Sequence, residues 1–172
     1  MRSIGQTSSA DIMATLSDLS FKYQFFMKTY RYRQFDWQPG AVLNKPLSQS
    51  RIAVVTSAAF YRPDQPPFDA SIRGGDYSFR EIPLETDLET LQIGHKSDAF
   101  DHSGIERDKN LALPLDRLRE LKAERLLGDV APRHYSLMGS ISAPARLVSM
   151  TAPEIARRLA ETRVDGVLLT PV

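Results

Sequence analysis

Hydrophobic and polar positions along the chain predict one amphipathic helix, followed by strands and helices in turn. Apolar residues recur at helical spacing between Asp11 and about Arg33. The apolar positions are Ile12, Leu16, Leu19, Tyr23, Phe26, Met27 and Tyr30. The other face carries Lys22, Lys28, Arg31 and Arg33, which is typical of a solvated helix surface. The pattern therefore predicts an amino-terminal surface helix.

The patterns of later segments predict strands and helices of an α/β domain. Residues 51–57 form a short β-branched run that ends at Ala58 and Ala59, typical of a first central strand. Residues 77–82 alternate enough for a second strand, after a turn at Gly74 and Gly75. A leucine stripe predicts a helix over 115–127, and Gly128 is expected to stop it.

The last part of the chain predicts a helix that feeds a hydrophobic strand. Thr151 and Glu154 have the spacing of a capping box, and residues 162–172 are expected to form a buried strand. A helix followed by such a strand is half of a βαβ unit. We predict an α/β fold with an open, mainly parallel, Rossmann-like sheet and flanking helices, preceded by the amphipathic helix. Residues 1–50 are expected to be a helix and linker packed on an α/β domain of residues 51–172.

Composition narrows the classes of function. At 172 residues and 42% hydrophobic content, one domain is expected. A net charge of +1 gives no electrostatic case for nucleic acid or an anionic membrane as partner. No transmembrane run or secretory signal is visible, so a cytoplasmic protein is expected. Zero cysteines leave no disulfide and no thiol nucleophile in the sequence. Neither a dinucleotide nor an NTP motif is present.

Two histidines frame one candidate site. His95, Asp98, Asp101 and His102 carry groups that suit zinc, iron or manganese, although the spacing matches no strong metal signature. A hydrogen-bonded turn is the alternative. Acid–base work by His102 has better support, because the adjacent Asp101 is the kind of residue that orients and tunes an imidazole.

A second candidate lies at Arg133 and His134. Arg133 has the fork geometry to clamp a substrate carboxylate. The structural alternative pairs Arg133 with Asp116 or Glu120 and makes His134 a helix cap. The segment from Asp108 to Pro114 is read as a turn. These clusters predict a polar loop site on an α/β domain, but they do not indicate which reaction it would catalyse.

Several stretches, in this order, resemble the selenoprotein B family of glycine, sarcosine, betaine and D-proline reductases, most closely the selenocysteine-bearing D-proline reductase type. They run from about residue 51 to the end. The stretches are Gly75–Pro83, Asp101 and His102 with Asp108 and Asn110, Pro114–Leu121, Gly128 with Ala131–His134, Met138 and Gly139, and Asp165–Val172.

The resemblance implies reductive cleavage of a C–N bond in an amino acid or related amine. It implies a pyruvoyl group on a partner subunit, which activates the amine, and a selenolate or thiolate that attacks the α-carbon. It also implies a dithiol or protein reductant, an oligomer, and no cofactor in this chain. Expected catalytic residues are Asp101, His102, Arg133 and His134. Expected substrate-binding or supporting residues are Asp76, Tyr77, Asp108, Asn110 and Thr170.

In the family, a segment like Leu168–Val172 is followed at once by the selenocysteine or cysteine. We therefore expect a chain terminated at an in-frame UGA, lacking its nucleophile and inactive alone. One alternative is a non-catalytic homologue that serves as a binding or regulatory subunit. Another is metal-dependent hydrolysis through His95, Asp98 and His102. The sequence does not determine which amine is the substrate.

Overall fold

The computed structural model describes residues 20–29, 40–95 and 102–172. The chain divides into two compact units, residues 1–41 and 42–172. In the first unit, helix α1 (Phe21–Thr29) confirms the central part of the predicted amino-terminal helix, and no residue of α1 is buried. The rest of the predicted helix lies outside the described residues. No helix in the described ranges is long and apolar enough to cross a membrane.

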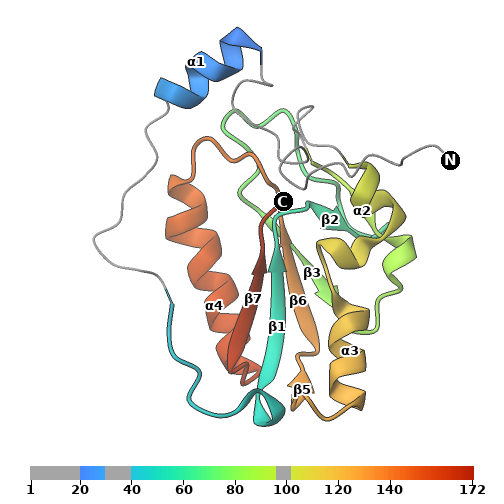
Figure 1. Ribbon diagram of the computed structural model, residues 1–172. Coiled ribbons are helices and arrows are strands. Elements are labelled where there is room, and N and C mark those ends of the chain that lie inside the picture. Colours follow the sequence, from blue (N-terminus) through green and yellow to red (C-terminus); the bar gives the residue numbers. More distant parts are fainter. Residues whose placement is uncertain (1–19, 30–39, 96–101) are drawn as a thin grey trace, which may run out of the picture. The chain divides into compact units, whose positions relative to one another are not determined.

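The second unit combines strands and helices, as predicted, although the segment with Arg133 and His134, expected to be a loop, forms a strand (Figure 1). Its strands are β1 (Arg51–Thr56), β2 (Phe60–Tyr61), β3 (Phe79–Pro83), β4 (Gln92–Ile93), β5 (Asp129–Val130), β6 (Arg133–Leu137) and β7 (Gly166–Thr170). Its α-helices are α2 (Ser103–Arg107), α3 (Leu115–Ala123) and α4 (Ala152–Glu161). Short 3-10 turns lie at Leu47–Gln49, Leu88–Thr90 and Lys109–Leu111, and a π-helical turn at Leu147–Thr151 precedes α4.

Strand β1 is the centre of a mostly parallel sheet, which confirms the predicted fold class. It pairs in parallel with β7 along one edge and with β5 and β6 along the other. Strand β3 pairs antiparallel with β6. Strands β2 and β4 form a separate antiparallel pair. The β-branched run of β1 suits this central place, because Ala53 and Val54 are fully buried on opposite faces of the sheet.

Each face of the sheet has its own core. Val54 and Ile82 face a cluster that includes Leu115 and Leu118 of α3. Ala53 and Tyr135 face a smaller cluster with Ile155 and Leu159 of α4. Period-two alternation along β1 and β6 therefore sends successive side chains to the two helical layers, as an α/β sheet requires.

The predicted helix over 115–127 is too long. Helix α3 ends at Ala123, and Arg125 takes a left-handed backbone conformation with φ of 62°. The turn leaves Leu126 54% exposed and buries Leu127 instead. Gly128 does not stop the helix. Its backbone lies against residues 49 and 50, where an added Cβ would come within 2.5 Å of the Gln49 carbonyl carbon.

The predicted capping box at Thr151 is also wrong. The π-helical turn already runs through Thr151, so its backbone is helical and its side chain makes no capping bond. The Thr151 hydroxyl donates to the Tyr77 carbonyl instead. Glu154 receives hydrogen bonds from the Arg157 and Arg158 side chains. The helix therefore starts earlier than its Thr–Glu spacing suggests.

The last strand is present but is not buried, so that part of the prediction is wrong. Val167, Leu168 and Leu169 are 41%, 40% and 67% exposed. The reason is position: β7 pairs with β1 on one side and with no other described strand. Other described residues cover the apolar side chains of Leu168 and Leu169 only in part.

Candidate functional site

The carboxyl ends of β1, β6 and β7 meet at one edge of the sheet (Figure 1). Just past this edge, the Ser57 amide donates to the Thr170 carbonyl at 3.2 Å. The Val172 amide donates to Ser57 Oγ at 2.9 Å. In open α/β sheets, ligands bind outside this edge, where loops rather than strands decide the chemistry. A ligand site is therefore expected at this edge of the sheet.

Two residues at this edge hold strained backbone conformations. Ala59, two residues beyond Ser57, has φ of 56°, and Ser140, three residues after β6, has the same value. Left-handed backbone is costly for residues with a Cβ, and such strain gathers at functional sites. The Ala59 position is fixed from both sides, because its amide donates to the Leu137 carbonyl and its carbonyl accepts from the Gly94 amide.

His95 lies against the backbone of this edge. A Cβ added to Gly139 would stand 2.2 Å from His95 Nε2 and 3.0 Å from the Ser57 carbonyl oxygen. Only a residue without a side chain lets the imidazole approach β6 so closely. Gly139 thus brings the His95 ring to the ends of β1 and β6.

His102 is the neighbour of His95 at this edge. The two ring centroids are 5.7 Å apart and the rings meet edge to face. Burial lowers the pKa of His95, and the nearby His102 lowers it further, so His95 is neutral at pH 7. His102 directly precedes α2, and its carbonyl accepts from the Glu106 amide. The structure therefore brings together the two histidines that frame the first candidate site.

Asp98 and Asp101 lie outside the described residues, so their predicted roles stay predictions. In the described ranges, no group of three or more His, Cys, Asp or Glu residues is placed to hold a metal ion.

The structure places Arg133 and His134 at the other end of β6 from Gly139. His134 is fully buried, and its Nδ1 accepts a hydrogen bond from the Val54 amide at 3.0 Å. Burial, with a smaller effect of the Arg119 charge, lowers the pKa of His134 to about 4. At about 3.3 Å per strand residue, the five residues from His134 to Gly139 span roughly 16 Å. His134 and His102 therefore do not share one edge of the sheet.

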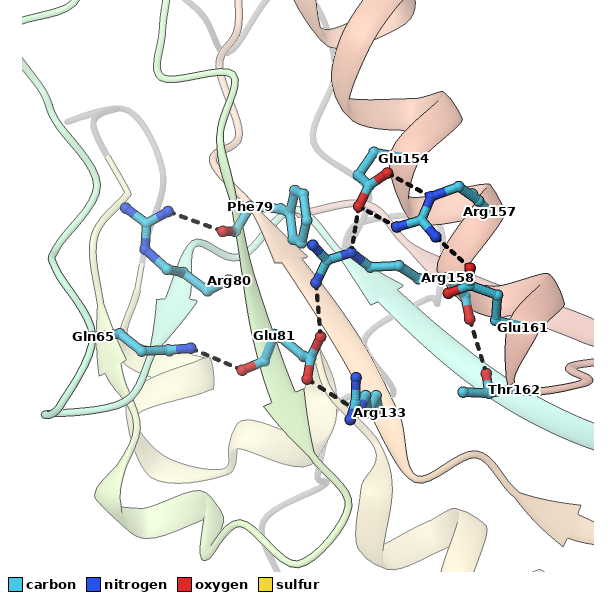
Figure 2. Close-up of polar contacts among 10 residues, drawn as sticks. All are labelled: Gln65, Phe79, Arg80, Glu81, Arg133, Glu154, Arg157, Arg158, Glu161 and Thr162. Atoms are coloured by element: carbon cyan, nitrogen blue, oxygen red, sulfur yellow. Dashed lines mark hydrogen bonds and ion pairs between the residues drawn. The ribbon is translucent and has the colours of Figure 1, made fainter.

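Arg133 takes part in an ion network between β3 and α4 (Figure 2). Its Nε lies 3.2 Å from the Glu81 carboxylate, which also receives Arg158 Nη1 at 3.1 Å. Arg158 in turn contacts Glu154, whose pKa falls to about 2 because Arg157 and Arg158 donate to it. The partner of Arg133 is thus Glu81, and neither Asp116 nor Glu120 of the alternative reading.

The predicted supporting residues hold loops together. Asp76 accepts from the Asp69 amide and from the Ser78 hydroxyl and amide. Asn110 and Asp116 exchange two hydrogen bonds of 2.9 and 3.0 Å.

Two further supporting residues make local hydrogen bonds. Asp108 accepts from the Asn110 amide. Thr170 donates to the Ala112 carbonyl at 2.6 Å, which ties β7 to the loop before α3. These contacts give each residue a structural role, and substrate contact by any of them stays a prediction.

Sequence reasoning gave Ser57 and Gly139 no role in a site, although Gly139 is among the stretches that resemble the family. Both follow strands at the carboxyl edge, and position alone could have marked them, because ligands of α/β sheets bind at strand ends. The contact between Gly139 and His95 had no signal in the sequence, since 44 positions separate them.

Comparison with known proteins adds a family match over residues 11–172, to glycine/sarcosine/betaine reductase selenoprotein B. The chain is 32% identical over 134 residues to the D-proline reductase subunit gamma of Acetoanaerobium sticklandii, covering 78% of this chain and 52% of that protein. It is 33% identical to the betaine reductase complex component B subunit beta of Peptoclostridium acidaminophilum, covering 73% and 29%. It is 31% identical to the glycine reductase complex component B subunit gamma of Symbiobacterium thermophilum, covering 82% and 33%.

The chain therefore spans about half the length of the first of these relatives and about a third of the other two. No solved structure matches it significantly.

Proposed function

Because this chain belongs to the glycine/sarcosine/betaine reductase selenoprotein B family, we propose that it is a component of a reductase that cleaves the C–N bond of an amino acid or related amine. The relatives are named as subunits of D-proline, betaine and glycine reductases, two of them as components of complexes. The observation that carries the proposal at residue level is the pair of histidines at the carboxyl edge of the sheet, at 5.7 Å between ring centroids.

His95 and His102 are proposed to move protons at this edge. A neutral His95 accepts a proton or a hydrogen bond at pH 7, which suits a substrate amine that must lose a proton to react. His102 is the second proton carrier, and Asp101 is proposed to orient it. Cleavage of the C–N bond needs a proton for the departing nitrogen, and a histidine pair provides both a donor and an acceptor.

The nucleophile of the proposed reaction is a selenolate or thiolate supplied from outside these residues, since the sequence has no cysteine. A pyruvoyl group on a partner subunit is proposed to activate the amine. A dithiol or protein reductant supplies the two electrons that the cleavage consumes.

Arg133 and His134 are left out of the proposed site. Arg133 is neutralised by Glu81, and His134 is fully buried with its Nδ1 occupied by the Val54 amide. Both residues lie at the end of β6 away from Gly139. We assign them to packing between β6 and its neighbours.

Activity of the reconstituted complex tests the proposal. The full-length subunit is combined with its partner subunits, and dithiol oxidation is followed with glycine, sarcosine, betaine and D-proline in turn. His102→Gln should lower turnover at least about a hundredfold, as loss of a general acid or base does. Arg117→Gln, which removes an exposed charge on α3, should leave turnover unchanged. A complex that turns over none of the amines would favour the non-catalytic subunit instead.

A further inference from the structure

A pocket of about 320 Å³ lies at the same edge of the sheet and carries two arginines. It is lined by Ile72, Arg73, Gly75, Tyr77, Ala143, Ala145 and Arg146. Among the described residues, no carboxylate lies within salt-bridge distance of Arg73 or Arg146, and no acidic side chain lines the pocket. Most other arginines of this unit do pair with carboxylates, for example Arg51, Arg62 and Arg119.

The walls of the pocket come from two loops at the carboxyl edge. One loop leads into β3, whose first residue, Phe79, lies opposite the last residue of β6, Leu137. The other loop follows β6 and includes Gly139, against which His95 packs. Ala143 of the pocket wall lies four residues beyond Gly139, a span of at most about 14 Å, so one loop carries both the wall and the contact with His95.

Glycines allow the two loops to meet. Gly74 and Gly75 have φ of 94° and 99°, a conformation that residues with side chains rarely adopt. A Cβ on Gly74 would lie 2.5 Å from Ala143 Cβ, and one on Gly75 would lie 3.0 Å from Ile141 Cα. The Ala143 amide also donates to the Gly74 carbonyl at 3.1 Å. The pocket is therefore built by fixed backbone contacts.

Tyr77 fixes one of the two arginines. The Arg146 guanidinium lies 5.3 Å from the centroid of the Tyr77 ring, which favours a cation there. The Thr151 hydroxyl holds the Tyr77 backbone from the π-helical turn. A guanidinium positioned in this way has its donor fork available for an anion.

We propose that this pocket binds the carboxylate of the amino-acid substrate, which rests on the proposed reductase function. Arg73 and Arg146 bind the carboxylate oxygens, and Ile72, Ala143 and Ala145 contact the apolar body of a small ligand. A phosphate would use the same arginines, but the apolar lining favours a small carboxylic acid. The carboxylate is thereby held on the loop that begins next to Gly139, against which His95 packs.

Nuclear magnetic resonance titration of the 172-residue chain tests the pocket without any turnover. The probes are D-proline, cyclopentanecarboxylate, pyrrolidine and inorganic phosphate, and the reporter is the Gly75 amide. The two carboxylates should shift this resonance, while pyrrolidine, which lacks a carboxylate, should not. The double variant Arg73→Gln/Arg146→Gln should weaken carboxylate binding at least about tenfold. Arg117→Gln should bind as the parent does.

The pocket proposal is overturned if neither carboxylate binds, if the double variant binds them unchanged, or if only phosphate binds. Turnover separates this proposal from the reductase proposal. Carboxylate binding that depends on Arg73 and Arg146, in a complex that reduces no amine, would refute the reductase and keep the pocket. Turnover with a KM that Arg73→Gln and Arg146→Gln leave unchanged would refute the pocket and keep the reductase.

Discussion

Replacing Gly139 by alanine is the sharpest test of the geometry at the carboxyl edge. The new methyl group would stand 2.2 Å from His95 Nε2, 2.9 Å from His95 Cδ2 and 3.0 Å from the Ser57 carbonyl oxygen. Unstrained contacts of this kind are about 3.5 Å or longer, so the imidazole must move by more than about 1 Å. We expect overpacking to lower the free energy of unfolding by about 1–3 kcal/mol.

The same substitution should change the titration of His95. Burial is the main cause that lowers its pKa, with the His102 charge second. A ring pushed away from Gly139 regains solvent, so the pKa of His95 should rise toward its ordinary value. Urea denaturation measures the stability, and a histidine NMR titration, assigned with His95→Gln, measures the pKa.

Gly104→Ala is the matched control for this experiment. Gly104 lies in α2, and an added Cβ would meet only Leu111 Cδ1, at an ordinary 3.5 Å. Alanine favours a helix over glycine by up to about 1 kcal/mol, so this variant should be neutral or slightly more stable. Equal stability of both variants, together with an unchanged His95 titration in Gly139→Ala, would refute the close approach of His95 to β6.

Two further outcomes follow from the structure. Burial lowers the pKa of His134 from 6.5 to about 4. Between these values the unfolded chain binds a proton that the folded chain does not, so stability present above pH 6.5 is lost as the pH falls. The loss is about 3 kcal/mol by pH 4, and His134→Asn should remove this part of the pH dependence in urea denaturation. Asn110→Ala removes both hydrogen bonds to Asp116 and should cost about 1–3 kcal/mol by the same assay, whereas an unchanged midpoint would contradict the pairing.

The central strand was the easiest part to predict because its pattern is local. The run at 51–57 is apolar on both faces, which only a central strand between two helical layers requires, and β1 occupies that place. Helix limits were harder. Leu126 continues the stripe of Leu118 and Leu121 at helical spacing, yet the chain turns at Arg125 and buries Leu127.

Pattern alone also did not show that Arg133 and His134 have different surroundings. Arg133 and His134 are adjacent in sequence and polar, which made them look like one site. Their strand sends them to opposite faces, where His134 enters the core beside Val54 and Arg133 meets Glu81. The exposure of β7 could not be read from its apolar residues, because burial depends on what covers a strand rather than on the strand itself.

The sequence by itself determined the α/β class, the central strand and the family, because these depend on local periodicity and on motifs that recur in order. Tertiary structure alone decided which side chains meet. His95 reaches Gly139 and Ser57, and Arg73 shares a pocket with Arg146, although long stretches of chain separate these residues. Such contacts arise from the packing of distant loops at one sheet edge, which no local pattern encodes.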